Sequence, residues 1–320
     1  MHRVDKKKGG AVRIRSSLAI CQRIGLVSVS VLMGALLAPS VSANSFLDLT
    51  VGLHADDNIT RGFLNSDIHK DQSAELALSG GRLFQLAPAN SVTAIGSVTT
   101  TRFAELSGLH SNSLSLGGTY QHKFGLGAYA PVMVGALVWT HHDSHSQTRD
   151  REVMELEISY GKRLSALWNL TAGATYEVSK GIHDARRHAS IYSTRNDIYD
   201  FNQGSVFAGA DYTLRNYAVI SASYTFGDGY VVSSALAPNP GLGSISRALT
   251  ADHAVQPPVG RKQVAYTLPA RTHLVDVNYS HPIGRDSSIN VGISRQLVKA
   301  RQGVDYTNNR ISLRFIQILH

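Results

Sequence analysis

The sequence predicts an all-β fold, an antiparallel transmembrane β-barrel. The expected number of strands is about 12, within a range of roughly 10 to 14. Three observations lead to this fold class. Apolar and polar residues alternate with a period of two, and short and long connections between these segments follow one another in alternation along the chain. In addition, no apolar run after residue 43 is long enough for a membrane helix. A chain that crosses a membrane without helices must cross it as closed strands.

Residues 1–43 have the three parts of a secretory signal peptide. A basic front is followed by an apolar core at residues 24–39 and by the small residues of Val41-Ser42-Ala43. The expected cleavage site is after Ala43, which leaves residues 44–320 as one barrel domain. The single cysteine, Cys21, lies in the leader, so the mature chain has no thiol for disulfide or thiolate chemistry.

The net charge of +8 belongs mostly to this leader. Residues 1–43 hold seven of the 31 basic residues and one of the 23 acidic residues, so the remainder has 24 and 22. A nearly balanced mature chain gives no support to nucleic acid as a partner.

The clearest alternation is in residues 153–178, which predict a β-hairpin. In its first arm Met154, Leu156 and Ile158 alternate with polar residues, and the second arm repeats the pattern from Leu170 to Val178. A period of two places the apolar set on one face of a strand and the polar set on the other.

The same pattern predicts five strands before this hairpin, at residues 47–54, 74–80, 92–98, 114–122 and 132–139. The second strand is expected to continue through a bulge to Leu86, and the fifth is apolar on both faces. Five more strands are predicted after the hairpin, at residues 206–214, 218–226, 275–279, 289–293 and 311–315. Residues 180–202 and 227–270 are predicted as long loops, and residues 316–320 as a tail beyond the last strand.

A β-sandwich would also show one apolar face per strand, but three features favour a barrel. The connections after the even-numbered strands are short, and those after the odd-numbered strands are longer and polar. The strand number is even, so both termini fall on the short-turn side. Aromatic residues lie near the strand ends on that side, as in an interfacial girdle: Tyr120, Tyr160, Trp168, Tyr212 and Tyr279.

Two short motifs carry a resemblance to known proteins. The first strand ends in Asp56-Asp57-Asn58-Ile59-Thr60-Arg61, and the chain closes with Arg310-Ile311-Ser312-Leu313-Arg314-Phe315. With the strand pattern of residues 44–320, these motifs resemble uncharacterised bacterial outer-membrane β-barrel proteins. They are also similar to the barrel half of the surface lipoprotein assembly modifier family. The resemblance implies an integral barrel in the cell outer membrane.

Charged residues on the polar strand faces are expected to point into the lumen, because a charge facing lipid costs about 2–4 kcal/mol at the membrane midplane. They are the candidate pore-lining residues Asp48, Glu75, Glu155, Glu157, Glu177, Asp211, Asp276, Arg310 and Arg314. The first functional hypothesis is therefore a porin-like pore for small hydrophilic solutes. A plug of ion pairs would present the same residues, and the two are not separated by sequence.

The alternative hypothesis is a structural or surface-interaction barrel that contacts a partner through its long external loops. A third hypothesis is an outer-membrane lipid hydrolase, because His142 and Ser144 share a strand face and could act as base and nucleophile. Such a site also needs a polar residue to orient the histidine, and none is identifiable.

No cofactor, metal ion or catalytic residue is expected under the first two hypotheses. Asp56-Asp57-Asn58 could offer oxygens to calcium, but a turn capped by side chains fits the residues better. The expected partners are outer-membrane lipid, the outer-membrane insertion machinery and either small solutes or a surface partner.

Overall fold

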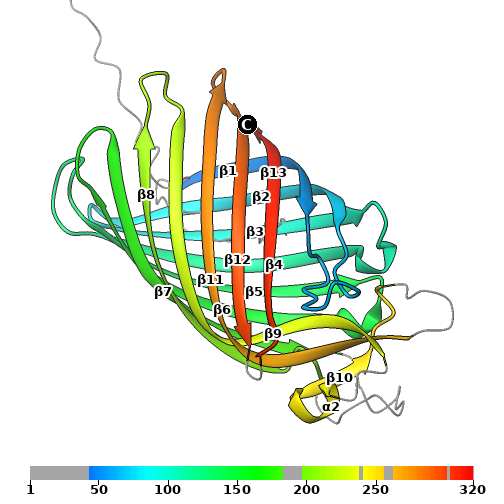
Figure 1. The fold of residues 1–320 in the computed structure, drawn as a ribbon. Helices are drawn as coiled ribbons and strands as arrows, with labels where there is room; N and C mark the ends of the chain where they lie inside the picture. Colours follow the sequence, from blue (N-terminus) through cyan, green and yellow to red (C-terminus); the bar gives the residue numbers. More distant parts are fainter. Residues whose placement is uncertain (1–42, 183–196, 238–240, 256–261, 301–302, 320) are drawn as a thin grey trace, which may run out of the picture.

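The computed structural model describes residues 43–182, 197–237, 241–255, 262–300 and 303–319, which are mostly strand. The predicted leader, residues 1–42 of it, therefore lies outside the described residues. Figure 1 shows long antiparallel strands that together form a closed barrel. The strands are β1 (Ala43–Asp56), β2 (Asp71–Ala87), β3 (Asn90–Phe103), β4 (Ser111–Lys123), β5 (Val132–Ser144), β6 (Arg151–Arg163), β7 (Trp168–Gly181), β8 (Phe201–Thr213), β9 (Val219–Ala237), β10 (Ala248–Ala251), β11 (Lys262–Ile283), β12 (Ser287–Ala300) and β13 (Asp305–Leu319). Three short helical segments lie between strands: η1 (Ser107–Leu109), η2 (Gln147–Arg149) and α2 (Leu242–Ile245).

Every strand except the short β10 belongs to the closed wall, which confirms the prediction of a 12-stranded antiparallel barrel. Neighbours in sequence pair in order from β1 to β9, then β9 pairs with β11 across the inserted α2 and β10. The wall closes where β1 pairs with β13, from Leu47 opposite Leu319 to Asp56 opposite Arg310. Closure leaves the described wall without an unpaired strand edge.

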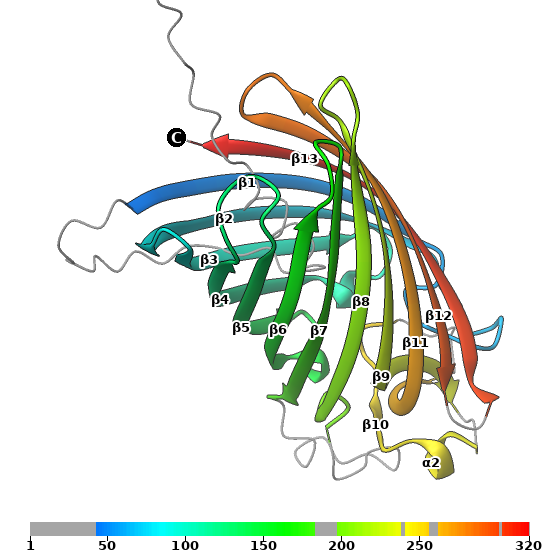
Figure 2. The ribbon, with the colours of Figure 1, turned by 90° about the vertical axis from the view of Figure 1, so that its left-hand side faces the viewer.

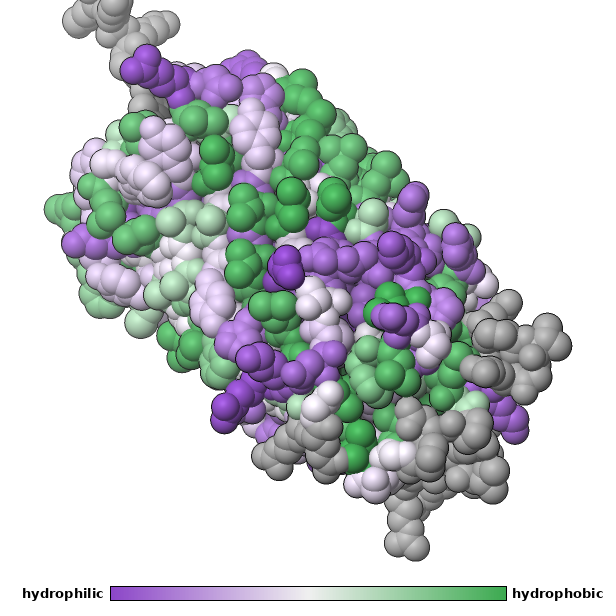
Figure 3. All heavy atoms as spheres, viewed as in Figure 1, coloured by the Kyte–Doolittle hydropathy of each residue, from purple (hydrophilic) through white to green (hydrophobic). Residues whose placement is uncertain are grey.

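The outer face of the wall is apolar, as the alternation predicted. Leu53, Ile158 and Ile293 are 56%, 56% and 59% exposed, while the residues directly before and after each of them in sequence face inward. Figure 3 shows hydrophobic side chains over the wall and hydrophilic ones gathering toward the end with the long loops. An exposed apolar band of this extent fits a lipid environment rather than water.

The short connections lie at one end of the barrel and were correctly placed by sequence. β2 and β3 are joined by Pro88 and Ala89, and the predicted bulge is a register shift between Gln85 and Ala87. Aromatic side chains are exposed at this end, and Trp168 packs against Tyr212 with ring centroids 4.8 Å apart. These features fit the turn end of a membrane barrel with its aromatic girdle.

The prediction of one loop over residues 227–270 is wrong. β9 continues to Ala237 and β11 begins at Lys262, so the two paired strands extend beyond the rest of the wall. The alternation disappears here because both faces of the ribbon are buried, as in Val231 to Ala235 and Gln263 to Leu268. A strand buried on both faces loses the period-two signal on which sequence reading depends.

The prediction of a tail at residues 316–320 is also wrong for its described part. β13 runs to Leu319, and Ile316 to Leu319 pair with residues of β1. Gln317 also accepts a 2.5 Å hydrogen bond from the Ser287 hydroxyl of β12. Among the described residues, no helix is long and apolar enough to cross a membrane.

Candidate functional site

All nine predicted lumen residues lie on the inward face of the wall. Asp48, Glu75 and Glu157 are 8%, 5% and 9% exposed, and the other six are partly exposed. On its own strand, each is separated by an odd number of positions from the exposed apolar residues, so its side chain points to the other face of the wall. The barrel interior is therefore lined by charged side chains.

One charged group lies where β2, β1 and β13 meet. Glu75, Gly52 and Arg314 are cross-strand neighbours in this order. A Cβ atom on Gly52 would lie 3.1 Å from His54 Nε2 and 3.3 Å from Arg314 Cγ, so glycine leaves room for these side chains. Glu75 lies 3.7 Å from His54, and Arg310 and Arg314 act on it electrostatically. Basic and acidic side chains are thus mixed on this part of the wall.

A second, purely acidic group lies on β6 and β7. Glu155 is directly opposite Glu177 in the strand register, and Glu157 is the next inward residue on β6. Glu177 accepts a 2.9 Å hydrogen bond from the Gln203 amide of β8. Further along the wall Asp211 accepts hydrogen bonds from Asn169 and Ser221.

The two groups face each other across the lumen. In the closed strand order, β6 is separated from β13 by β1 to β5 on one side and by β7 to β12 without β10 on the other. β13, which carries Arg310 and Arg314, is therefore diametrically opposite β6, which carries Glu155 and Glu157. The mixed basic and acidic side chains around β13 thus lie opposite the purely acidic group of β6 and β7, so the electrostatic potential differs between the two sides of the lumen.

The long-loop end of the barrel is covered by a cap, defined as residues 231–237 of β9, α2, β10, residues 252–255 and residues 262–270 of β11. In the cap β11 pairs with β9 on one edge and β10 on the other. Figure 1 shows β10 and α2 at the end opposite the C-terminus, and Figure 2 shows them below the wall strands. Its apolar cluster includes Tyr266, Leu268 and Leu242, each at most 2% exposed.

The cap reaches the loops of distant strands. The Ser234 amide donates a 2.9 Å hydrogen bond to the Thr60 carbonyl in the β1–β2 connection. The Thr267 hydroxyl donates to the Ile198 carbonyl in the β7–β8 connection. Gly108 of η1 lies so close to Ala254 that a Cβ atom would come within 2.4 Å of the alanine Cα. Contacts around so much of the rim mean that the cap spans the mouth.

A buried ion pair joins the cap to the β5–β6 connection. Arg149 of η2 donates a 2.7 Å hydrogen bond to Asp252, whose side chain is fully buried, and a 2.9 Å bond to Ser234. Ser234 and the Ala254 amide also donate to Asp252. Burial alone would raise the pKa of Asp252, but Arg149 and these hydrogen bonds hold it below its usual value. We refer to Arg149, Ser234 and Asp252 as the latch.

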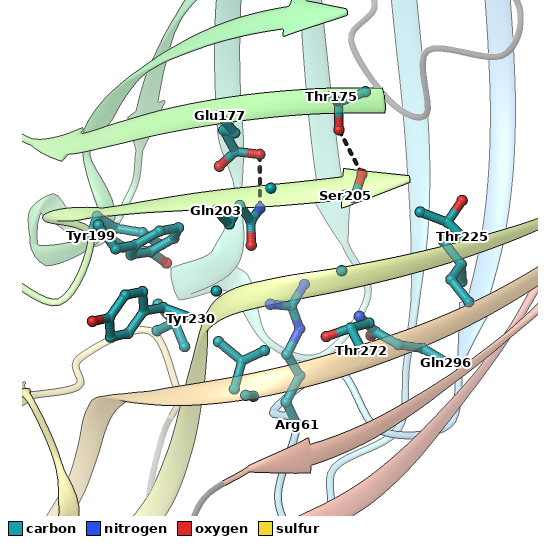
Figure 4. A pocket seen from close by; sticks show the side chains of 18 of the residues that line it. Arg61, Thr175, Glu177, Tyr199, Gln203, Ser205, Thr225, Tyr230, Thr272 and Gln296 are labelled. Carbon is teal, nitrogen blue, oxygen red and sulfur yellow. Dashed lines mark hydrogen bonds between the residues drawn. The ribbon is translucent and has the colours of Figure 1, made fainter. Parts of the chain in front are cut away.

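A cavity of about 430 Å³ lies inside the barrel beside the cap. Its wall comes from β6, β7, β8, β9, β11 and β12 and from Tyr199 of the β7–β8 connection, and Arg61 enters it from the β1–β2 connection. Figure 4 shows the Arg61 guanidinium pointing into the space between Gln203 and Thr272. Of the nine predicted lumen residues, only Glu177 lines this cavity.

The proposed hydrolase pair gains little from the structure. His142 and Ser144 share the inward face of β5, as predicted, and the residue opposite His142 on β6 is the cation Arg151. In the described part of the chain, neither a carboxylate nor Ser144 forms a hydrogen bond with His142. Across all the residues that the structure describes, no group of three or more side chains is placed to hold a metal ion.

The Asp56–Arg61 motif is a braced turn. The backbone N–H of Asn58 donates a hydrogen bond to the Asp56 carboxylate, and the Asp57 carboxylate accepts hydrogen bonds from the backbone and side chain of Asn309 on β13. These side-chain caps agree with the turn reading of the sequence rather than with a calcium loop. Sequence reasoning missed the consequence that the turn carries Arg61 into the barrel.

Comparison with known proteins supports the fold. No family model and no curated protein matches the chain, so the resemblance to the surface lipoprotein assembly modifier barrel stays a prediction. The structure is similar to the COG4313 outer membrane channel from Pseudomonas putida F1, with 13% identity, 91% of this chain and 100% of that chain covered, and a TM-score of 0.56. A weaker likeness, with 9% identity and a TM-score of 0.45, is to the KdgM porin in complex with disordered oligogalacturonate, covering 85% and 99% of the two chains. At these identities the likeness concerns the fold alone, that of outer-membrane β-barrels.

Proposed function

We propose that the protein is a porin-like channel of the bacterial outer membrane that passes small hydrophilic solutes. The observation that carries this proposal is the uneven charge of the lumen, with the two arginines of β13 opposite the acidic group of β6, inside a barrel with an apolar exterior. Charges that only stabilise a wall can pair with near neighbours, whereas Glu155 faces a like charge at Glu177. Like charges placed together destabilise a sheet, so their presence calls for a role beyond stability.

The direct test is the conductance of purified protein in planar lipid bilayers. We expect discrete channel steps of small amplitude, because the cap narrows the long-loop mouth. The absence of steps at every voltage tested, for wild type and for a variant without the cap, would refute the proposal.

Replacement of Glu155 and Glu157 by Gln should shift ion selectivity toward anions. The double variant replaces two carboxyl groups of the lumen with neutral amides and leaves Arg310 and Arg314 in place, so cations lose attraction. The reversal potential in a KCl gradient measures the shift. Glu152→Gln is the matched control, because Glu152 lies on the same strand and faces outward. An equal shift in both variants would contradict a lumenal role for Glu155 and Glu157.

The alternative function, a surface-interaction barrel, rests on the cap as an ordered external structure. The cap would then present a partner-binding face, and its removal would abolish binding without changing conductance. The opposite result, a change in conductance, favours the channel.

A further inference from the structure

We propose that the cavity beside the cap binds a small hydroxylated monocarboxylate of the sugar-acid class, with Arg61 holding its carboxylate. The inference rests on the proposed channel function and adds a solute class to it. A volume of about 430 Å³ is within the usual range for small-molecule sites of roughly 300–1,000 Å³.

Arg61 is held in an unusual conformation that presents its side chain to the cavity. Its φ of 55° is rare for a residue other than glycine and costs on the order of 1–3 kcal/mol. Asn58 fixes the turn by bonding both the amide and the carbonyl of Gly62, at 2.8 and 2.9 Å. Among the described residues no carboxylate pairs with the Arg61 guanidinium, which therefore keeps its five donors for a ligand. A guanidinium fork matches a carboxylate in bidentate geometry.

The facing wall offers neutral polar groups rather than further cations. Thr225, Thr272 and Gln296 line the cavity on β9, β11 and β12, and Gln203 adds an amide oxygen beside Glu177. Figure 4 shows these side chains around the space in front of Arg61. Hydroxyl and amide groups both donate and accept, so they can pair with the several hydroxyls of a sugar.

Small and aromatic residues shape the remaining space. Gly204 and Gly227 line the cavity without side chains, which leaves its volume open. Tyr199, Phe201 and Tyr230 form a wall near the cap, with Phe201 6.5 and 6.1 Å from the two tyrosine rings. An apolar ring wall beside convergent polar groups is the usual composition of a specific site.

The charge of the lining favours a single negative charge on the ligand. Arg61 and Arg151 supply two positive charges and Glu177 one negative charge. Arg151 stacks over the Tyr199 ring at 4.6 Å, so Arg61 is the cation that faces the open space. A second carboxylate on the ligand would be repelled by Glu177.

The test measures block of chloride current by D-glucuronate in planar bilayers. D-glucuronate should reduce the current at concentrations where D-glucose, which lacks the carboxylate, and acetate, which lacks the hydroxyls, have little effect. Arg61→Gln should raise the half-blocking concentration about tenfold, which corresponds to a lost charged hydrogen bond. Thr272→Val, which keeps the side-chain shape, should raise it severalfold. Arg271→Gln is the control, because Arg271 is on the outer face of the same strand and 70% exposed.

Titration calorimetry with detergent-solubilised protein separates the two proposals. Conductance with neither block nor binding of D-glucuronate would overturn the site and leave the channel. Binding that depends on Arg61, without conductance, would overturn the channel and leave the site. Equal binding by wild type and Arg61→Gln, with both proteins showing folded, heat-modifiable gel mobility, would overturn the assignment of Arg61.

Discussion

Arg149→Met is expected to raise single-channel conductance severalfold while the barrel stays folded. The substitution leaves the buried Asp252 carboxylate without its cation, and breaking a buried pair in this way costs about 3–5 kcal/mol. The contacts of the cap are then lost at the β5–β6 rim, whereas the wall depends on strand pairing elsewhere. Conductance in planar bilayers measures the effect, and heat-modifiable gel mobility checks the barrel.

The double variant Arg149→Met, Asp252→Leu is the matched control for this prediction. It removes both charges, so the cap should close again and conductance should fall back toward wild type. Deletion of residues 241–255 should give the largest conductance of all. If neither Arg149→Met nor the deletion alters conductance, but the deletion abolishes binding to a surface partner, the surface-interaction function is correct.

The latch also predicts how the cap responds to pH. Because the folded-state pKa of Asp252 is below its usual value, the stability it contributes is present above the unfolded pKa of about 3.9 and is lost as pH falls through the folded value. Conductance of the wild type should therefore show no opening of the latch between pH 7 and pH 5. An increase that is abolished in the double variant would contradict this assignment.

Deletion of residues 316–320 should remove most of the protein from the outer membrane. The described part of this segment supplies four cross-strand pairs at the seam between β1 and β13, and Gln317 is bonded to Ser287 of β12. Without them the two ends of the wall are joined over a shorter length, and an exposed strand edge favours aggregation. Membrane fractionation should show less barrel in the outer membrane and more degraded chain in the periplasm.

Phe315→Ser tests the aromatic of the same strand. Phe315 is exposed on the outer face, so serine exchanges a lipid contact for a hydroxyl and should lower the yield. Phe315→Tyr keeps the ring and should give the wild-type yield in the outer membrane. Removal of the terminal residue alone is the control for the truncation. Wild-type yield from the deletion of residues 316–320 would show that the seam does not limit assembly.

The wall was predictable because one rule governs it. Lipid outside and polar groups inside enforce alternation, so Leu53, Ile158 and Ile293 could be placed on the outer face from sequence. The inward position of Glu155 and Arg314 followed from the same rule. The alternation of short and long connections favoured a barrel over a sandwich, which the structure confirms.

The cap and the cavity could not be predicted in this way. Val231 and Val232 are neighbours and both are buried, so their pattern is that of an apolar run inside a segment rich in glycine and proline. Arg149 and Asp252 lie 103 positions apart in polar connections, where nothing local signals a partner. Arg61 was part of a noted motif, but its entry into the cavity follows from the turn that Asn58 fixes by bonding Gly62, and the motif letters do not show this geometry.

The cap is continuous with β9 and β11, whereas its other contacts with the rim are non-covalent. A movement of the cap that keeps both strands paired would therefore be a tilt about the edge where those two strands leave the wall. The gap made by such a tilt would be widest beside the β3–β4 and β5–β6 connections, which carry Gly108 and Arg149. A solute entering there would first travel along the wall that carries Glu155 and Glu157, so the entry route, and not the lumen alone, would help select which ions pass.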